Sequence, residues 1–125
     1  MKKKIKRIYI IVHDLESDTF LVYINEMTGR LVFPGCFVSS DNDYLHDVKQ
    51  YMQMVVGFSV DDKNIFRLRQ VKDAAVYAIR LNVGDNKNID DLIVFWHNHK
   101  YLTSGLHSDH RDLYKEYIKF LRRLR

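Results

Sequence analysis

The chain has 125 residues, 46% of them hydrophobic and 29% charged, with a formal net charge of +4 at pH 7. This size and composition predict one globular domain over residues 1–125 and argue against two domains. No apolar run approaches the roughly 20 residues of a bilayer span, and the basic start is followed only by the short run IYIIV, so we expect neither a membrane span nor a signal peptide.

The first third of the chain has the composition of short strands. Residues 5–12 and 19–25 are rich in Ile, Val and Tyr, and the turn-prone sequence DLESD separates them. A glycine turn in EMTGR precedes a third apolar stretch, Leu31–Phe33, which ends at Pro34. We therefore expect a β-hairpin followed by a short strand.

The period of the apolar residues then changes from two to about 3.6, which predicts a helix over Tyr44–Val56. The residues on its apolar face are Leu45, Val48, Met52 and Val55. Gly57 stands where a helix commonly stops, and Asp41 or Asp43 is expected to cap the start.

Three strands and a final helix complete the expected order. The strands fall at 65–71, 75–81 and 92–96, and Ser108 or Asp109 is the expected cap of the helix. Its apolar side carries Leu113, Tyr117, Phe120, Leu121 and Leu124. This order predicts an α+β fold, a mixed α/β sandwich with helices covering opposite faces of one sheet.

The segment RLVFPGCFVSSDNDYLHDVKQYMQMVVGF, residues 30–58, resembles the signature segment of the Nudix family, which hydrolyses a nucleoside diphosphate linked to another group. That signature is glycine, five residues, glutamate, seven residues, then Arg-Glu-apolar-any-Glu-Glu-any-Gly-apolar, usually after Pro-Gly. Pro34-Gly35 sets a register that runs without a gap. It places Gly35 in the Pro-Gly pair, Cys36 at the signature glycine, Asn42 at the first glutamate, Gln50 at the arginine, Tyr51 at the next glutamate, Met54 and Val55 at the paired glutamates, and Gly57 at the closing glycine. The strands and last helix also follow the family's order, so the resemblance implies a Nudix-like fold, a mixed β-sheet between helices.

The resemblance also implies what is missing. In the family, carboxylates of this segment hold Mg²⁺, a hard cation that needs oxygen ligands, and Met54 and Val55 supply none. We therefore interpret the chain as a degenerate, catalytically inactive member without a cofactor. The alternative is weak or non-standard hydrolysis of nucleoside-diphosphate-X substrates through the displaced acids Asp41, Asp43 and Asp47.

Some Nudix-fold proteins with incomplete motifs bind RNA or belong to RNA-processing and ribosomal assemblies. The resemblance therefore implies binding of RNA, a nucleotide or a ribonucleoprotein surface, with aromatic residues for stacking and basic residues for phosphates. The candidate phosphate-binding residues are Lys2, Lys3, Lys4, Lys6, Arg7, Lys119, Arg122, Arg123 and Arg125. They form one patch only if the fold brings the chain ends together. A third hypothesis is a protein partner on the degenerate helix face.

The histidine-rich stretch FWHNHKYLTSGLHSDHRDL offers a second alternative. His97 and His99, followed by Ser108 and Asp112, resemble the zinc site of JAMM peptidases. Both later spacings are one residue longer than in that family, and Glu26 is the only candidate for the activating glutamate. Histidines of a polar loop are the favoured interpretation, and no metal site is assigned.

A single cysteine, Cys36, excludes an intramolecular disulfide and is typical of a reducing compartment. We expect a cytoplasmic or nuclear protein. No partner base for Cys36 is identifiable, so we interpret it as a small buried thiol at a tight turn.

Overall fold

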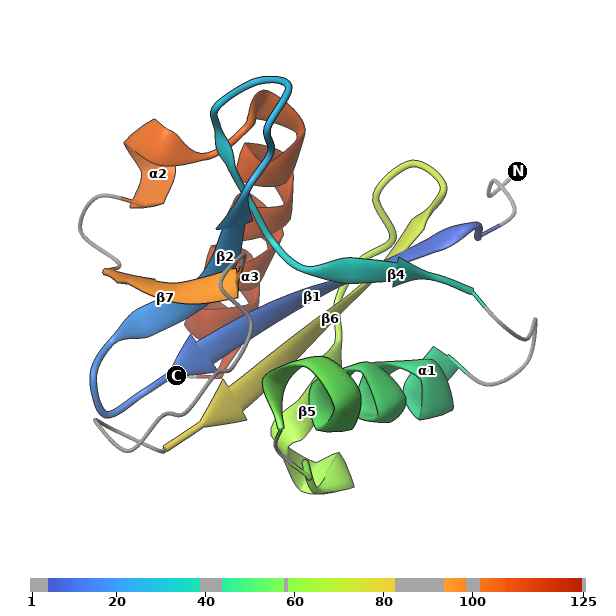
Figure 1. Ribbon diagram of the computed structural model, residues 1–125. Helices are drawn as coiled ribbons and strands as arrows, with labels where there is room; N and C mark the ends of the chain where they lie inside the picture. Colours follow the sequence, from blue (N-terminus) through green and yellow to red (C-terminus); the bar gives the residue numbers. More distant parts are fainter. Residues whose placement is uncertain (1–4, 39–43, 58, 83–93, 99–101, 125) are drawn as a thin grey trace.

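In a computed structural model, the described residues are 5–38, 44–57, 59–82, 94–98 and 102–124 (Figure 1). Their strands are β1 (Arg7–Asp14), β2 (Thr19–Ile24), β3 (Leu31–Val32), β4 (Gly35–Phe37), β5 (Ile65–Arg67), β6 (Ala74–Leu81) and β7 (Val94–Asn98). Their helices are α1 (Tyr44–Tyr51), the π-helical turn η1 (Met52–Val56), the 3₁₀ turn η2 (Asp62–Asn64), α2 (Leu102–Gly105) and α3 (Ser108–Arg123).

Strand β1 is the centre of the sheet. It pairs in parallel with β6 along its whole length, from Arg7 opposite Ala74 to Asp14 opposite Leu81. Its other edge pairs with β4 at the beginning and with β2 at the end, both antiparallel. β5 continues the sheet beyond β6, and β3 and β7 pair with β2. The mixed sheet expected from the sequence is therefore confirmed.

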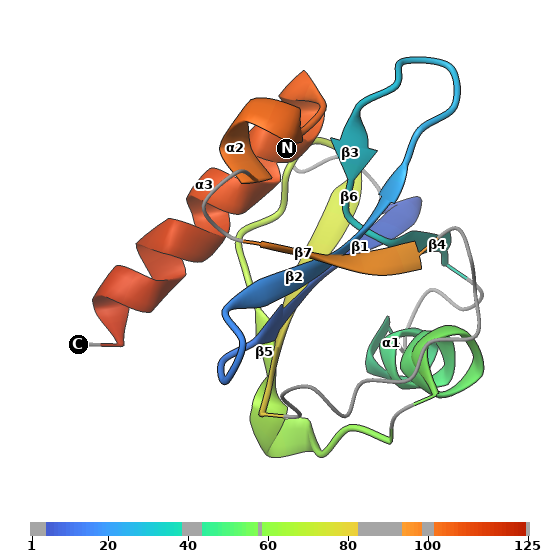
Figure 2. The same ribbon diagram turned by 60° about the vertical axis from the view of Figure 1, so that its left-hand side comes forward.

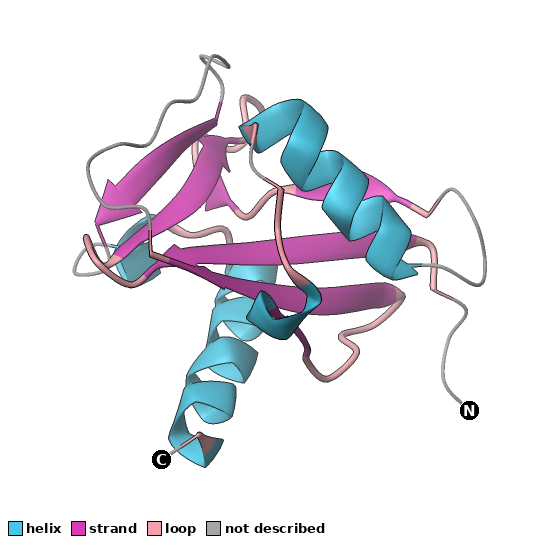
Figure 3. Ribbon diagram, turned by 90° about the horizontal axis from the view of Figure 1, so that it is seen from below, coloured by secondary structure: helices cyan, strands magenta, loops and turns pink. Residues whose placement is uncertain are grey.

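Helices cover both faces of this sheet (Figures 2 and 3). Alternate residues of β1 point to opposite faces, so Ile8, Ile10 and Val12 pack in the core beneath α1. Ile11 packs in the second core with Tyr114 and Tyr117 of α3. Because both faces are covered, β1 is almost continuously apolar.

The helix expected at Tyr44–Val56 ends differently from a regular helix. Its last turn is π-helical, because Gly57 N–H donates to the carbonyl of Met52 at 2.8 Å, five residues back. Val48 and Met52 are fully buried, as the apolar periodicity indicates. Gly57 then closes the turn with a φ of 85°, in the left-handed region that favours glycine.

Three local expectations were wrong. Residues 35–37, where no strand was expected, form β4, because Gly35 lies opposite Tyr9 in the β1 ladder. The strand expected at 65–71 ends at Arg67, since Val71 and Ala74 bond to each other in a tight turn. The cap of α3 is His107, whose Nδ1 accepts from Asp109 N–H at 3.2 Å.

No helix among the described residues is long and apolar enough to cross a bilayer.

Gly35 has a steric reason to be glycine. A Cβ built there would lie 2.6 Å from the carbonyl oxygen of Ile8 and 2.9 Å from Cδ1 of Tyr9. The first contact is with backbone of the central strand, which has no freedom to move aside. Gly105 differs, because its Cβ would meet the side-chain end of Leu31 at 2.8 Å.

We predict that Gly35→Ala lowers the free energy of unfolding by about 1–3 kcal/mol, as overpacking against fixed backbone does. Gly105→Ala is the matched control, and we expect a smaller loss because the Leu31 side chain can rotate. Urea denaturation of the two variants measures both values. An equal or larger loss in Gly105→Ala would contradict the steric account of Gly35.

Candidate functional site

A cavity of about 200 Å³ lies where the edge of β1 changes partner. β4 pairs with Arg7, Ile8 and Tyr9, whereas β2 pairs with the far end of β1, so β4 and β2 diverge from the same strand. We call the opening between them the fork. The residues that line it are Arg7, Ile8, Tyr9, Tyr23, Asn25, Val32, Gly35, Cys36, Phe37 and His110. Four strands, β1 to β4, and the last helix therefore contribute to one cavity.

The fork carries aromatic rings and one cation. Phe37 is 72% exposed and lies directly opposite Arg7 in the β1–β4 ladder. The Arg7 guanidinium carbon is 5.2 Å from the centre of the Phe37 ring, and its Nη1 is 3.5 Å from the Tyr9 hydroxyl. Burial raises the pKa of Tyr23, so that phenol stays neutral at physiological pH. The arrangement offers ring faces together with a positive charge.

A second cavity of about 320 Å³ adjoins the fork and shares Arg7, Tyr9, Asn25, Val32 and His110 with it. Its other walls come from the β5–β6 turn and the first turns of α3. They contribute Val71, Lys72, Asp73, Ala74, His107, Asp109, Asp112 and Leu113. Because three of these are aspartates, we call this second space the acidic cavity. The two together form a groove with an aromatic end and an acidic end.

His110 lies at the junction of the two cavities. It is 7% exposed, and its Nδ1 accepts a hydrogen bond from the Phe33 backbone N–H at 3.0 Å. Its ring meets the Tyr9 ring edge to face, with centroids 4.9 Å apart. Burial is the main cause that lowers its pKa to about 4, and His107 lowers it further. The ring is therefore neutral at pH 7, with its proton on Nε2.

Gly35 and Cys36 of the Nudix register line the fork, whereas the register positions on the helix lie apart from the groove, on the α1 side of the sheet. Tyr51 and Val55 pack against the core beneath α1, whereas Gln50 and Met54 are exposed, Met54 at 74%. Asn42 lies outside the described residues. Across the described part of the chain, no group of three or more His, Cys, Asp or Glu side chains is placed to hold a metal ion.

The displaced acids and the cysteine have distinct positions. Asp41 and Asp43 fall in the segment 39–43, which the structure does not describe. Asp47 is 5% exposed on the inner side of α1. Cys36 was expected at a tight turn, but it lies half-buried within β4, opposite Ile8. Burial, followed by the Asp47 charge, raises the pKa of its thiol. A protonated thiol is a poor nucleophile, which agrees with a structural role for Cys36.

The described basic residues of the two ends are not brought together. Lys6 directly precedes β1 and Arg7 is its first residue. Arg7 lines the acidic cavity together with residues of the first turn of α3. Lys119, Arg122 and Arg123 are in the last turns of α3, at its opposite end (Figure 2). Lys2, Lys3, Lys4 and Arg125 are outside the described ranges. Any phosphate contacts at the two ends are therefore separate.

The residues of the zinc alternative are only partly described. The backbone of His97 lies in β7 opposite Phe20, and His99 belongs to the undescribed segment 99–101. Ser108 begins α3 and Asp112 follows one turn later, while Glu26 is exposed in the β2–β3 hairpin. No contact among the described residues joins Glu26 to Ser108 or Asp112.

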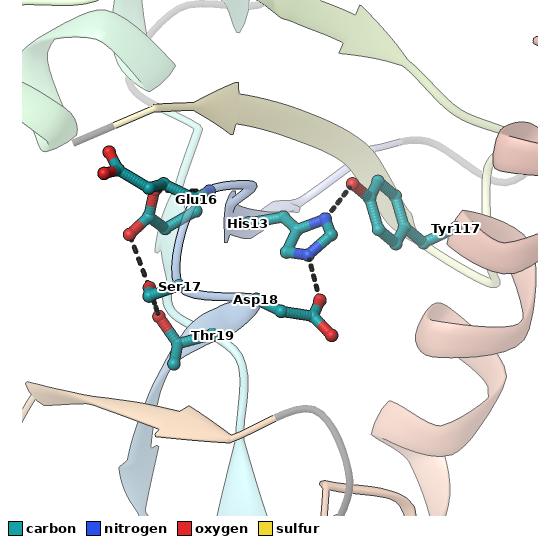
Figure 4. Close-up of polar contacts among 7 residues, drawn as sticks. His13, Glu16, Ser17, Asp18, Thr19 and Tyr117 are labelled. Atoms are coloured by element: carbon teal, nitrogen blue, oxygen red, sulfur yellow. Dashed lines mark hydrogen bonds and ion pairs between the residues drawn. The ribbon is translucent and has the colours of Figure 1, made fainter. Parts of the chain in front are cut away.

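A separate polar cluster fastens the β1–β2 turn to α3 (Figure 4). His13 is stacked on Phe20, its Nδ1 is 2.7 Å from the Tyr117 hydroxyl, and its Nε2 is 2.8 Å from Asp18 Oδ1. Because a carboxylate only accepts, the ring donates from Nε2 to Asp18, and in a singly protonated ring Nδ1 then accepts from the Tyr117 hydroxyl. Burial raises the pKa of Tyr117 to about 12. Tyr117 is fully buried and out of reach of a substrate, so this order of groups is structural.

The sequence did not single out Tyr9, Tyr23, Phe37 or His110 as site residues. Tyr9 and Phe37 are far apart in the chain, and only the β1–β4 pairing makes them neighbours. The one sequence signal was the high count of Tyr and Phe, 8 and 7 residues, which does not separate core from surface.

Solved structures of other proteins share this arrangement. The NUDIX domain of Shewanella oneidensis NrtR, crystallised with ADP ribose, matches with a TM-score of 0.68 at 13% identity, over 97% of this chain and 90% of that chain. The C-terminal domain of mouse MUTYH, crystallised with human PCNA, matches at 0.69 and 12%, over 93% and 88%. An Ap4A hydrolase of C. elegans matches at 0.62 and 11%, over 95% and 99%. These likenesses establish a Nudix-like α+β fold, a mixed sheet with helices.

No protein-family model matches the sequence, and no curated protein matches it.

We predict that His110 makes the free energy of unfolding fall as the pH is lowered from 6.5 to 4. The unfolded chain protonates this histidine near pH 6.5, whereas the folded chain does so only near pH 4. The contribution is therefore complete above pH 6.5 and is lost, by about 2–3 kcal/mol, as the pH falls to 4. His110→Asn keeps an acceptor for Phe33 N–H but has no proton to take up. Urea denaturation at pH 7, 5.5 and 4 should show a shallower decline in the variant, and parallel curves would contradict the prediction.

Proposed function

We propose that this Nudix-fold chain binds nucleotides without hydrolysing them, either as free nucleotides or as units of single-stranded RNA. The observation that carries the proposal is the fork, where Phe37 is exposed opposite Arg7 and beside Tyr9 and Tyr23. A ring face with a neighbouring guanidinium suits the base and the phosphate of one nucleotide.

The positions in the Nudix register support the non-catalytic part of the proposal. A magnesium-dependent hydrolase needs anionic oxygens that project from this helix toward the diphosphate. Here Tyr51 and Val55 are turned into the core, and Met54 presents a thioether to solvent. A thioether is a soft ligand and a poor partner for Mg²⁺. The scaffold is present, whereas the ligands that the family uses on the helix are absent from these positions.

The geometry of the fork supports the binding part. Exposure of the Phe37 ring to water is unfavourable, because its apolar surface stays hydrated. The Arg7 guanidinium covers the ring only in part. Base stacking on such a ring contributes roughly 1–3 kcal/mol and tolerates any base. The groove also has the size of a small-ligand site, since the acidic cavity alone is about 320 Å³.

Two of the similar structures bear on the ligand. The NrtR NUDIX domain was crystallised with ADP ribose, a nucleotide, and the MUTYH domain was crystallised with the protein PCNA. The first supports a nucleotide ligand on this fold. The second supports a protein partner as a competing role, for which exposed Met54 on the former catalytic face is the contact we would test. An assembly that contains RNA, such as a ribonucleoprotein, would accommodate both roles.

We predict no Mg²⁺-dependent turnover of a dinucleotide or of capped RNA by the purified chain, because the helix supplies no carboxylates at the register positions. Product analysis by ion-exchange chromatography measures this directly. Turnover that disappears in Asp41→Asn or Asp43→Asn would overturn the proposal and establish the displaced-acid hydrolase instead.

We predict that Phe37→Ala weakens binding of a fluorescent single-stranded RNA about ten-fold, since it removes one stacking ring. Met27→Ala is the matched control, because Met27 is 96% exposed in the β2–β3 hairpin and lines neither cavity. Fluorescence polarisation measures the dissociation constants, and calorimetry with AMP and ADP-ribose gives the free-nucleotide arm.

Salt dependence separates this proposal from the protein-partner role. Phosphate contacts make the logarithm of the affinity fall linearly with the logarithm of the salt concentration. If Phe37→Ala and Met27→Ala changed the affinity for RNA equally, the fork would not be the binding site. Absence of both RNA and nucleotide binding at low salt would also contradict the proposal.

A further inference from the structure

His110 presents one unused hydrogen-bond donor to the groove. Its Nδ1 is occupied by Phe33 N–H, which leaves the proton of the neutral ring on Nε2. Nε2 has no hydrogen-bond partner among the described residues, although the side chain is more than nine-tenths buried and lines both cavities. Nε2 is not among the described side-chain atoms that are both fully buried and without a partner, so it opens onto the groove, where a ligand atom is able to accept its proton in place of water.

Carboxylates stand on the acidic side of the same histidine. Asp109 follows the helix cap, lines the acidic cavity, and is close enough for its charge to act on the His110 imidazole. Lys72 Nζ lies 3.6 Å from one Asp109 oxygen and His107 Nδ1 lies 4.0 Å from the other, both beyond hydrogen-bond distance, so the carboxylate keeps acceptor positions for a ligand. Asp73 and Asp112 line the same cavity. The walls of this cavity also carry the cations Arg7 and Lys72, so its carboxylates exceed its cations by only one. The carboxylates offer several acceptor oxygens, so this end of the groove suits a neutral group that donates hydrogen bonds.

The fork determines which part of a bound nucleotide reaches His110. Arg7 and Tyr9 line both cavities, and the Tyr9 ring touches the His110 ring. A ligand that stacks its base in the fork therefore places the next part of the molecule beside His110. In a nucleotide that part is the sugar.

We infer that the acidic cavity reads the ribose 2′-hydroxyl, with His110 and Asp109 as the specificity-determining residues, so that the groove takes ribonucleotides in preference to deoxyribonucleotides. The inference rests on the proposed function of the fork. A hydroxyl both donates and accepts, and the 2′-hydroxyl is the group that lets a protein distinguish RNA from DNA. His110 Nε2–H donates to its oxygen, and the Asp109 carboxylate accepts its hydrogen. A deoxyribose makes neither contact.

The test compares three labelled single strands of one sequence, made of RNA, of 2′-fluoro RNA and of DNA (with uracil in place of thymine), by fluorescence polarisation. The full chain should bind RNA about ten-fold more tightly than DNA, the effect of losing a hydrogen bond that involves a charged group. The 2′-fluoro strand has no hydroxyl proton for Asp109, so its affinity should fall toward that of DNA.

Two variants and one control localise the effect. His110→Asn retains an acceptor for Phe33 N–H and lacks the Nε2 donor, and Asp109→Ala lacks the acceptor. Each should reduce the RNA-to-DNA affinity ratio several-fold toward one. Glu116→Ala removes the same charge from α3 outside both cavities and should leave the ratio unchanged.

The outcomes are separable. Equal binding of RNA and DNA by the unaltered chain, or an equal change of both affinities in Asp109→Ala, overturns the ribose inference while the fork keeps its proposed function. Absence of binding to all three strands overturns both.

Discussion

The structure depends on how the two edges of β1 are used. One edge is filled by β6 in parallel register over all eight residues of β1, which fixes the centre of the sheet. The other edge is divided between β4, which pairs with the beginning of β1, and β2, which pairs with its end. A strand edge that changes partner leaves an opening between the two neighbours. The fork is that opening, and it brings Arg7 and Tyr9 beside Phe37 and Tyr23.

The same constraint explains why the Pro-Gly element and the closing glycine are present without the metal ligands. Gly35 lies where β4 meets the Ile8 carbonyl so closely that a Cβ does not fit, and Gly57 ends the π-helical turn with a positive φ. Both requirements come from the backbone and are independent of any metal ion. The carboxylate positions have no such backbone role, so Tyr51 and Val55 fill the core there instead.

Two buried histidines attach α3 to the sheet, one near each end of the helix's contact with β1. His13 joins the β1–β2 turn to Tyr117, and His110 accepts from the backbone of Phe33. In His13 both ring nitrogens form hydrogen bonds, to Tyr117 and to Asp18, so its role is structural. The second has one nitrogen left over in a cavity. That difference in hydrogen bonding, and not the residue type, separates a structural histidine from a candidate binding group.

The sequence by itself determined the elements whose signals are local. The period of Val48 and Met52 predicted the buried face of α1, Gly57 predicted its end, and the apolar stretches predicted most strands, because these depend on neighbours a few residues apart. The tertiary structure alone decided the rest. It converted residues 35–37 into β4 by pairing them with β1, separated the described basic residues of the two ends, and set His110 between two cavities. These features arise from contacts between residues 26 or more positions apart, such as Tyr9 with Gly35 or Phe33 with His110, which no local pattern encodes.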